Sequence, residues 1–268
     1  MELACWQTAG TSGEPGEPGD PAVVEANLAA LDAAAAEAAA GGADLLVTPE
    51  MVLTGYAVGR EAVHRLAGLP LAERVAEVAR RHRLAVVAGL PELDGGACWN
   101  TALAVGADGE VLARHRKAHL FGELDRGTFA PGGRLVTTFD LPGAGGVRVA
   151  LLVCYDVEFP EAVRAAALAG AHLVAVPTAQ MEPFAWVAEE LVRVRAWENQ
   201  LYVAYVDRVG AEGDLVYVGR SSVVDPSGAV LASARDGEAL LRATVDPRRV
   251  AAAQRANPYL ADRRTDLY

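Results

Sequence analysis

The sequence predicts an α/β protein in which two mixed β-sheets pack face to face between outer helices, an α-β-β-α sandwich. Three observations support this prediction. Short apolar runs alternate with longer helical stretches. Glycine-containing turns join some neighbouring runs directly, which predicts hairpins within the sheets. Hydrophobic residues make up 52% of the 268 residues, and two sheets with helices outside would bury them on both faces of each sheet.

The expected elements follow from hydrophobic periodicity and from turn residues. Strands are expected at residues 2–7, 44–48, 84–90, 99–105, 110–117, 134–139, 146–154, 172–176, 201–209, 214–224, 229–235 and 239–245. Helices are expected from Ala22 to Ala40, Ala62 to His82, Pro160 to Ala169 and Pro183 to Gln200. Hairpin turns are expected at Asp94-Gly95-Gly96, Asp108-Gly109 and Ser227-Gly228.

Two glycine-containing stretches mark an expected helix end and an expected loop. Gly41-Gly42 stops the first helix, as glycine commonly does. The low-complexity stretch Gly10 to Asp20 is expected to form a mobile surface loop after the first strand. No other stretch is long or polar enough to be a linker, so we expect one domain spanning residues 1–268.

Charge and cysteine content exclude several classes of function. A net charge of −11 argues against nucleic acid or an anionic membrane as partner, because binding phosphates requires clustered Lys and Arg. Cys5, Cys98 and Cys154 have scattered spacings that fit neither a disulfide framework nor a metal site. The sequence has no secretory leader pattern and no apolar run of about 18 residues. We therefore expect a cytoplasmic protein with no membrane partner.

Cys154 ends the apolar run 146–153 and is followed by a polar loop, so it is a candidate nucleophile. A lone cysteine at a strand end more often serves packing. Two other apolar runs, however, end in the same way, one delivering Glu50 and the other Lys117. Active sites of layered α/β folds gather at strand ends. A base, a cation and a thiol are the groups that thiol-dependent amide hydrolysis needs.

These residues and their flanks resemble the nitrilase superfamily of carbon-nitrogen hydrolases, whose triad is Glu, Lys and Cys in that order. The matching segments are Pro49-Glu50-Met51, Arg116 to Gly122 and Cys154 to Glu161, with further similar stretches at Pro177 to Met181, Arg193 to Asn199 and Gly219 to Gly228. The resemblance covers nearly the whole chain. It implies the four-layer α-β-β-α sandwich of that family and the catalytic residues Glu50, Lys117 and Cys154.

In the expected mechanism Glu50 takes the thiol proton while Cys154 attacks a carboxamide carbon. The oxyanion faces Lys117 and the backbone N–H of Tyr155. Ammonia leaves from a thioester, and water activated by the same carboxylate releases the acid. No metal and no organic cofactor is required.

The resemblance also implies a second acid that supports the lysine, and either Glu123 or Asp125 fits that role. We expect the substrate pocket to include Tyr56, Glu158, Thr178 and Met181.

Family members that act on anionic substrates often have arginine shortly after the nucleophile, whereas this chain has Val157 and Glu158. This departure favours neutral or cationic amides.

Two further patterns have less specific interpretations. His115 and His119 are spaced as metal ligands on a helix would be, but this segment is expected to be strand and loop, so we expect no metal. Trp186 and Trp197 lie near one face of the last predicted helix, where they indicate core packing or a subunit interface. The resemblance implies a homo-oligomer, a two-fold dimer or a multiple of it.

The leading hypothesis is an amidase that cleaves a small linear carboxamide. A nitrilase and an N-carbamoyl-amine hydrolase are alternatives with the same chemistry. A catalytically silent interaction module and a thiol redox sensor are alternatives from other classes. The intact triad disfavours the silent module, and a sensor would need Cys5 or Cys98 as resolving thiol.

Overall fold

The computed structural model describes residues 1–10 and 19–267. Most of the stretch Gly10 to Asp20, expected to be a mobile loop, lies outside the described residues. Asp20 itself caps the first helix, because its Oδ1 accepts a hydrogen bond of 2.8 Å from the backbone N–H of Ala22.

The described residues form two large sheets of six strands each. The first has the order β14-β1-β2-β3-β4-β5. Its strands are β1 (Glu2–Gln7), β2 (Leu45–Val47), β3 (Ala85–Asp94), β4 (Ala97–Val105), β5 (Val111–Arg116) and β14 (Ala239–Thr244). Neighbouring strands β1, β2 and β3 run parallel, and the other pairs are antiparallel.

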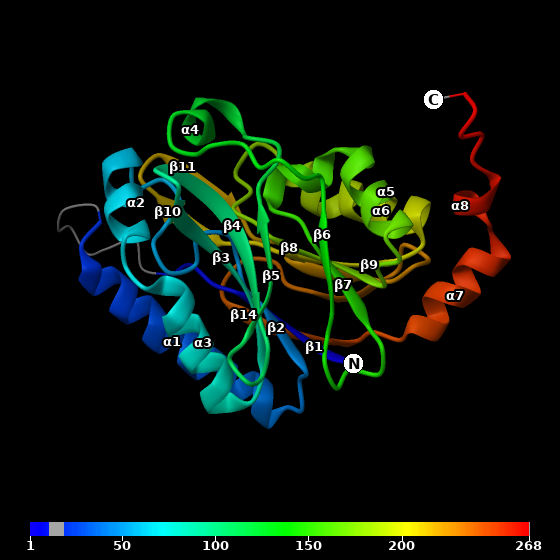
Figure 1. Ribbon diagram of the computed structural model, residues 1–268, viewed down its shortest axis with the longest axis horizontal. Coiled ribbons are helices and arrows are strands. Elements are labelled where there is room, and N and C mark those ends of the chain that lie inside the picture. Colours follow the sequence, from blue (N-terminus) through cyan, green and yellow to red (C-terminus); the bar gives the residue numbers. More distant parts are fainter. Residues whose placement is uncertain (11–18, 268) are drawn as a thin grey trace.

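The second sheet has the order β13-β12-β9-β8-β7-β6. Its strands are β6 (Thr137–Asp140), β7 (Arg148–Leu151), β8 (Leu173–Pro177), β9 (Tyr202–Val206), β12 (Ser222–Val224) and β13 (Val230–Ser233). Here β7, β8 and β9 are parallel. A separate hairpin, β10 (Val209–Glu212) with β11 (Leu215–Val218), lies at the same end of the molecule as α4 and α2 (Figure 1).

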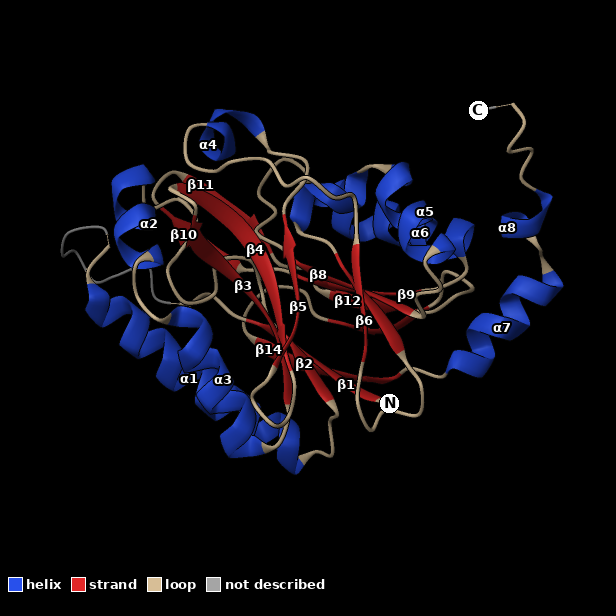
Figure 2. Cartoon of the chain, in the orientation of Figure 1, coloured by secondary structure: helices blue, strands red, loops and turns tan. Residues whose placement is uncertain are grey.

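Helices cover the outer face of each sheet (Figures 1 and 2). The first sheet is covered by α1 (Pro21–Ala40), α2 (Arg60–Ala67) and α3 (Leu71–His82), and the second by α5 (Pro160–Leu168) and α6 (Val192–Asn199). A π-helical turn (Val187–Leu191) leads into α6, and a 3-10 helix (Cys154–Glu158) precedes α5. The remaining helices are α4 (Gly122–Arg126), α7 (Pro247–Ala256) and α8 (Tyr259–Asp262).

The side-chain alternation of the strands explains the layers. In β2, Leu45 and Val47 point into the core between the sheets, whereas Leu46 packs against the helices. In β7, Val149 faces the core between the sheets and Ala150 faces the α5–α6 layer. Each sheet therefore has two apolar faces, which is why its central strands are continuous apolar runs. The predicted α-β-β-α sandwich is confirmed.

Three expected elements were wrong in extent, because each divides into two. The helix predicted from Ala62 to His82 is two helices, α2 and α3, because Gly68 and Pro70 lie between them and neither favours a continuing helix. The strand predicted at 214–224 is also two elements: β11 belongs to the small hairpin and β12 to the second sheet. The chain changes direction at Gly219 and Arg220, which have φ 63° and 56°.

The run predicted at 201–209 likewise divides, since β9 ends at Val206 and β10 begins at Val209. The three expected hairpin turns are confirmed, since they join β3 to β4, β4 to β5 and β12 to β13 in antiparallel pairs. Helices α4, α7 and α8 were not expected. Among the described residues, no helix combines the length and the apolar character that crossing a bilayer demands.

Candidate active site

Three strand ends bring the predicted base, cation and nucleophile to the junction of the two sheets. Glu50 follows β2 and Lys117 follows β5 in the first sheet, whereas Cys154 follows β7 in the second. Nζ of Lys117 lies 2.9 Å from Oε1 of Glu50, and both side chains are fully buried. Cys154 is also buried. The backbone N–H of Glu50 donates to the carbonyl of Thr178, at the end of β8, so the loops of the two sheets are bonded together.

Cys154 stands at a sharp turn of the backbone. Its φ is 45°, in the left-handed region that non-glycine residues seldom adopt. The chain leaves β7 here and enters the 3-10 helix that begins at Cys154. Tyr155 is the next residue of this helix, so its backbone N–H belongs to the first turn, where N–H groups have no helical acceptor. The turn thus places a thiol and a candidate oxyanion donor side by side.

The structure separates the two acids that sequence reasoning left open. Oδ2 of Asp125 lies 2.7 Å from Nζ of Lys117, and its side chain is fully buried. Oδ1 of Asp125 accepts a hydrogen bond of 2.8 Å from the hydroxyl of Tyr56. Glu123, by contrast, is 93% exposed and pairs with Arg126 at the surface. Asp125 is therefore the acid that contacts Lys117.

Burial and mutual charge set the ionisation of this cluster. Burial raises the pKa of Glu50, although Lys117 opposes that rise. For Lys117 burial disfavours the charged form, but the carboxylates of Glu50 and Asp125 outweigh it and raise the pKa well above its usual range. Burial and the charge of Glu50 raise the pKa of the Cys154 thiol. The resting site therefore holds a lysine cation and a neutral thiol.

Asn100 is a site residue that sequence reasoning missed. Its Nδ2 donates to Oε1 of Glu50 at 2.5 Å, and its carbonyl accepts from the backbone N–H of Lys117 at 2.8 Å. It thus fixes one carboxylate oxygen. Oε2 of Glu50 has no hydrogen-bond partner within the described residues, so that oxygen is the one available to take a proton. A polar side chain within the apolar run 99–105 was the signal that could have identified Asn100.

The expected pocket residues surround the cluster in different ways. The ring of Tyr56 lies under Lys117, with Nζ 5.7 Å from the ring centroid. Met181 and Tyr56 belong to one buried apolar cluster. Thr178 supports the Glu50 loop through its carbonyl. Glu158 is half-buried, and its Oε1 accepts a hydrogen bond of 3.0 Å from Nε2 of Gln180. Burial raises the pKa of Glu158.

The rings of His115 and His119 both face the carboxylate of Asp156, at 3.2 and 2.8 Å. The described part of the chain contains no group of three or more His, Cys, Asp or Glu side chains arranged to hold a metal ion. Trp186 and Trp197 are 59% and 47% exposed. Their interpretation as core packing was therefore wrong, and the alternative, a subunit interface, stays a prediction.

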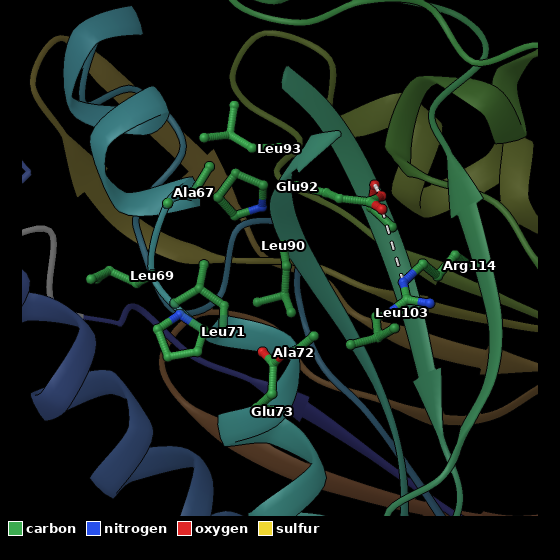
Figure 3. A pocket seen from close by; sticks show the side chains of 14 residues that line it. Ala67, Leu69, Leu71, Ala72, Glu73, Leu90, Glu92, Leu93, Leu103 and Arg114 are labelled. Atoms are coloured by element: carbon green, nitrogen blue, oxygen red, sulfur yellow. Dashed lines mark hydrogen bonds and ion pairs between the residues drawn. The ribbon is translucent and has the colours of Figure 1, made fainter. Parts of the chain in front are cut away.

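A cavity of about 390 Å³ lies elsewhere, between helices α2 and α3 and strands β3 to β5 (Figure 3). Its lining includes Leu69, Leu71, Leu90 and Leu103, and an ion pair of 3.9 Å between Glu92 and Arg114 spans its edge. None of the three triad residues lines this cavity.

Comparisons with known proteins agree with this geometry. The family model for carbon-nitrogen hydrolases matches residues 12–255. A protein of Pseudomonas protegens named "Hydrolase in pqqF 5'region" is 43% identical over 249 residues, which are 91% of this chain and 86% of that protein. An (R)-stereoselective amidase of Pseudomonas sp. is 39% identical over 232 residues, 85% of this chain and 82% of that enzyme.

Solved structures of amidases are also similar to this chain. A mutant of the amidase from Nesterenkonia sp. AN1, carrying the acetamide moiety of fluoroacetamide on its active-site cysteine, has a TM-score of 0.83 and 36% identity, covering 100% of this chain and 95% of that chain. Other mutants of that amidase are solved in complex with acrylamide and with butyramide. The chain belongs to the carbon-nitrogen hydrolase family, in the amidase-like branch of the nitrilase superfamily.

Proposed function

We propose that this protein hydrolyses small linear carboxamides to ammonia and a carboxylic acid through a thioester on Cys154. The observation that carries the proposal is the buried ion pair of 2.9 Å between Lys117 and Glu50 at the junction where the Cys154 strand ends. Structures of the Nesterenkonia amidase with acrylamide and with butyramide support carboxamides over nitriles and N-carbamoyl compounds. Neither a redox sensor nor a catalytically silent module would require the ion pair between Lys117 and Glu50.

Each group has one chemical task in the proposed reaction. Glu50 removes the thiol proton as Cys154 attacks the carbonyl carbon, which forms a carbon–sulfur bond and an oxyanion. Lys117 and the backbone N–H of Tyr155 stabilise that oxyanion. The proton on Glu50 then passes to the amide nitrogen, and ammonia leaves. Water then gives a proton to Glu50 and attacks the thioester, the carbon–sulfur bond breaks, and Glu50 returns the proton to the thiolate as the acid leaves.

The raised pKa of the base, Glu50, suits this sequence of steps. A free thiol has a pKa of about 8.5, far above that of an ordinary carboxylate, so proton transfer between them is unfavourable in water. Burial raises the pKa of Glu50 and makes it a stronger base. Because Lys117 remains cationic, the charge on the site stays balanced when the proton moves.

Asp125 is proposed as the supporting acid, because it contacts Lys117 and Glu123 does not. We also propose that residues 1–268 act as a single domain and that the protein is a two-fold dimer or a multiple of it. The free thiols Cys5, Cys98 and Cys154 support a reducing, cytoplasmic setting.

Replacing Cys154 with Ala tests the mechanism. Ammonia release from a panel including butyramide and acrylamide is expected to fall to background, because no thioester can form. Thermal unfolding should stay near that of the wild type, because the change removes little core volume. Cys5→Ala, which removes another buried thiol, should keep its turnover. Substantial ammonia release by Cys154→Ala would refute the mechanism.

A further inference from the structure

We propose that Asp156 is a positioning residue that fastens the loop carrying Lys117 to the turn carrying Cys154. The proposal rests on the amide hydrolysis proposed above. It concerns how base, cation and nucleophile from different sheets keep their relative places.

The carboxylate of Asp156 receives hydrogen bonds from both triad loops. On the Lys117 side, Oδ1 accepts from the backbone N–H of Ala118 at 3.2 Å and of His119 at 2.9 Å. On the Cys154 side, Oδ2 accepts from the backbone N–H of Val153 at 3.1 Å. Ala118 directly follows Lys117, and Val153 directly precedes Cys154. One carboxylate thus joins the backbone flanks of two triad residues.

Two imidazole rings also contact the carboxylate of Asp156. Nδ1 of His119 lies 2.8 Å from Oδ1, and Nε2 of His115 lies 3.2 Å from Oδ2. The His119 ring also stacks on Phe159, with centroids 3.8 Å apart. These contacts hold the carboxylate from the strand before Lys117 as well as from the loop after it.

The Asp156 side chain is fully buried, where an unpaired carboxylate would be strongly disfavoured. Burial alone would raise its pKa, but the hydrogen bonds from His115 and His119 outweigh burial and lower the pKa to about 2. The group is therefore charged under all working conditions, and its bonds are of the stronger, charge-assisted kind.

Within the described residues, no ladder of backbone hydrogen bonds joins the strand before Lys117 to the strand before Cys154. Strand β5 is an edge strand of the first sheet, whereas β7 is an inner strand of the second sheet, between β6 and β8. The two strands that deliver Lys117 and Cys154 are therefore not paired with each other. The hydrogen bonds described for the Asp156 carboxylate go to backbone N–H groups and to imidazole rings, so we infer that it acts through the placement of Lys117 and Cys154.

Asp156→Asn is the test variant. Asparagine keeps the size of the side chain, but its amide nitrogen cannot accept a hydrogen bond from a backbone N–H. The matched control is Asp225→Asn. Asp225 is also a buried carboxylate that holds a turn, accepting from the backbone N–H groups of Ser227 and Ala229, and it contacts neither triad loop.

With butyramide as substrate, Asp156→Asn is expected to lower kcat by about 100-fold, because a misplacement near 1 Å at a reacting centre costs about that much. KM should change by less than about threefold, because substrate contacts are kept. Alkylation of Cys154 by iodoacetamide, followed by peptide mass spectrometry, should slow by at least about tenfold. Asp225→Asn should keep both rates.

A folded Asp156→Asn variant with a kcat within about twofold of the wild type would overturn the proposal. So would an equal loss of kcat in Asp225→Asn. If Asp156→Asn does not fold, His119→Ala decides, because it removes one bond to Oδ1 at a partly exposed position. We expect its kcat to fall about fivefold, as for the loss of one hydrogen bond. An unchanged kcat would count against the proposal.

The alkylation rate separates this proposal from the proposed function. If the wild type releases ammonia from no amide, the function is refuted. Iodoacetamide needs no turnover, so equal labelling of Cys154 in wild type and Asp156→Asn would still refute the positioning role on its own.

Discussion

Burial raises the pKa of both Glu50 and Cys154, so Glu50 is a stronger base than a solvated carboxylate and the Cys154 thiol holds its proton more tightly. Lys117 opposes these rises and keeps its own charge through contacts with Glu50 and Asp125. The consequence is a thiol that is protonated at rest and is deprotonated only as it attacks. Such a thiol should be a poor target for oxidants, in contrast to the low-pKa thiols of redox sensors.

Glu158 is the residue that we expect to set the preference between neutral and anionic substrates. It is half-buried beside Gln180, and burial raises its pKa although Gln180, Lys117 and Arg195 oppose the rise. Butyramide should be turned over with a kcat/KM at least about tenfold higher than succinamic acid, because like charges at close range cost several kcal/mol. Kinetics on this matched pair measure the preference.

Glu158→Arg should reverse the preference, and Glu161→Arg serves as its control. Glu161 undergoes the same charge change three positions further on, at an exposed site. Its effect should be small because water and salt screen it. Equal turnover of butyramide and succinamic acid by the wild type would show that Glu158 does not set specificity.

The placement of Glu50, Lys117 and Cys154 at strand ends could be predicted from the sequence, because each follows a run that is visible locally. The choice between Glu123 and Asp125 could not be made in this way. It depends on the short helix α4, which points Asp125 inward and Glu123 to solvent. The contact of Asn100 with Glu50 joins residues fifty positions apart, and such contacts are fixed only by the pairing of strands.

Helices and strands could be predicted where nearby residues mark their ends. They were predicted wrongly where their bounds depend on pairing with distant strands. Helix α1 begins and ends close to the predicted bounds because Asp20 and Gly41 mark its ends. The predicted strand 214–224 has two apolar parts, 215–218 and 223–224, separated by Gly219 to Ser222, and β11 and β12 bond to different partners. Hydrophobicity predicts that a segment is extended, but it does not say which neighbour it will pair with.

Gly132 shows how a loop element constrains Lys117. Its N–H donates to the Lys117 carbonyl at 2.8 Å, and an added Cβ would stand 2.1 Å from the Arg116 carbonyl oxygen. Gly132→Ala should therefore displace the end of β5 and lower kcat by at least about tenfold. Ammonia release and thermal unfolding measure the effect.

Gly133→Ala is the neighbouring control, because nothing lies within 4 Å of its added Cβ. Its stability should stay within about 0.5 kcal/mol of the wild type, as for most surface substitutions. If Gly132→Ala behaves like Gly133→Ala, the loop does not constrain Lys117.

At the scale of the molecule, the exposed apolar residues around α6 favour self-association. Phe184, Trp186, Val194 and Trp197 are each 44% to 59% exposed, and such groupings commonly mark interfaces. We expect light scattering at micromolar concentration to give twice the chain mass of 28.0 kDa. Trp197→Glu should shift the protein toward monomer, because a charge would be buried in the interface.

Leu93→Glu introduces the same charge at an equally exposed leucine on β3, in the other sheet, and should leave the mass unchanged. A wild type of 28.0 kDa in solution would contradict the dimer.

The nucleophile and its two partners come from opposite layers of the sandwich, and this division has a consequence for the enzyme as a whole. The core between the sheets is apolar, and its contacts have no direction. A shift of one sheet over the other would keep the hydrogen bonds within each sheet but would break those that join Glu50 to Thr178 and Asp156 to His119. Such a slip would leave the helices and strands intact and still separate the thiol from its base. The turnover rate therefore reports the relative position of the two sheets. A measurement of helix and strand content would not detect a change in that position.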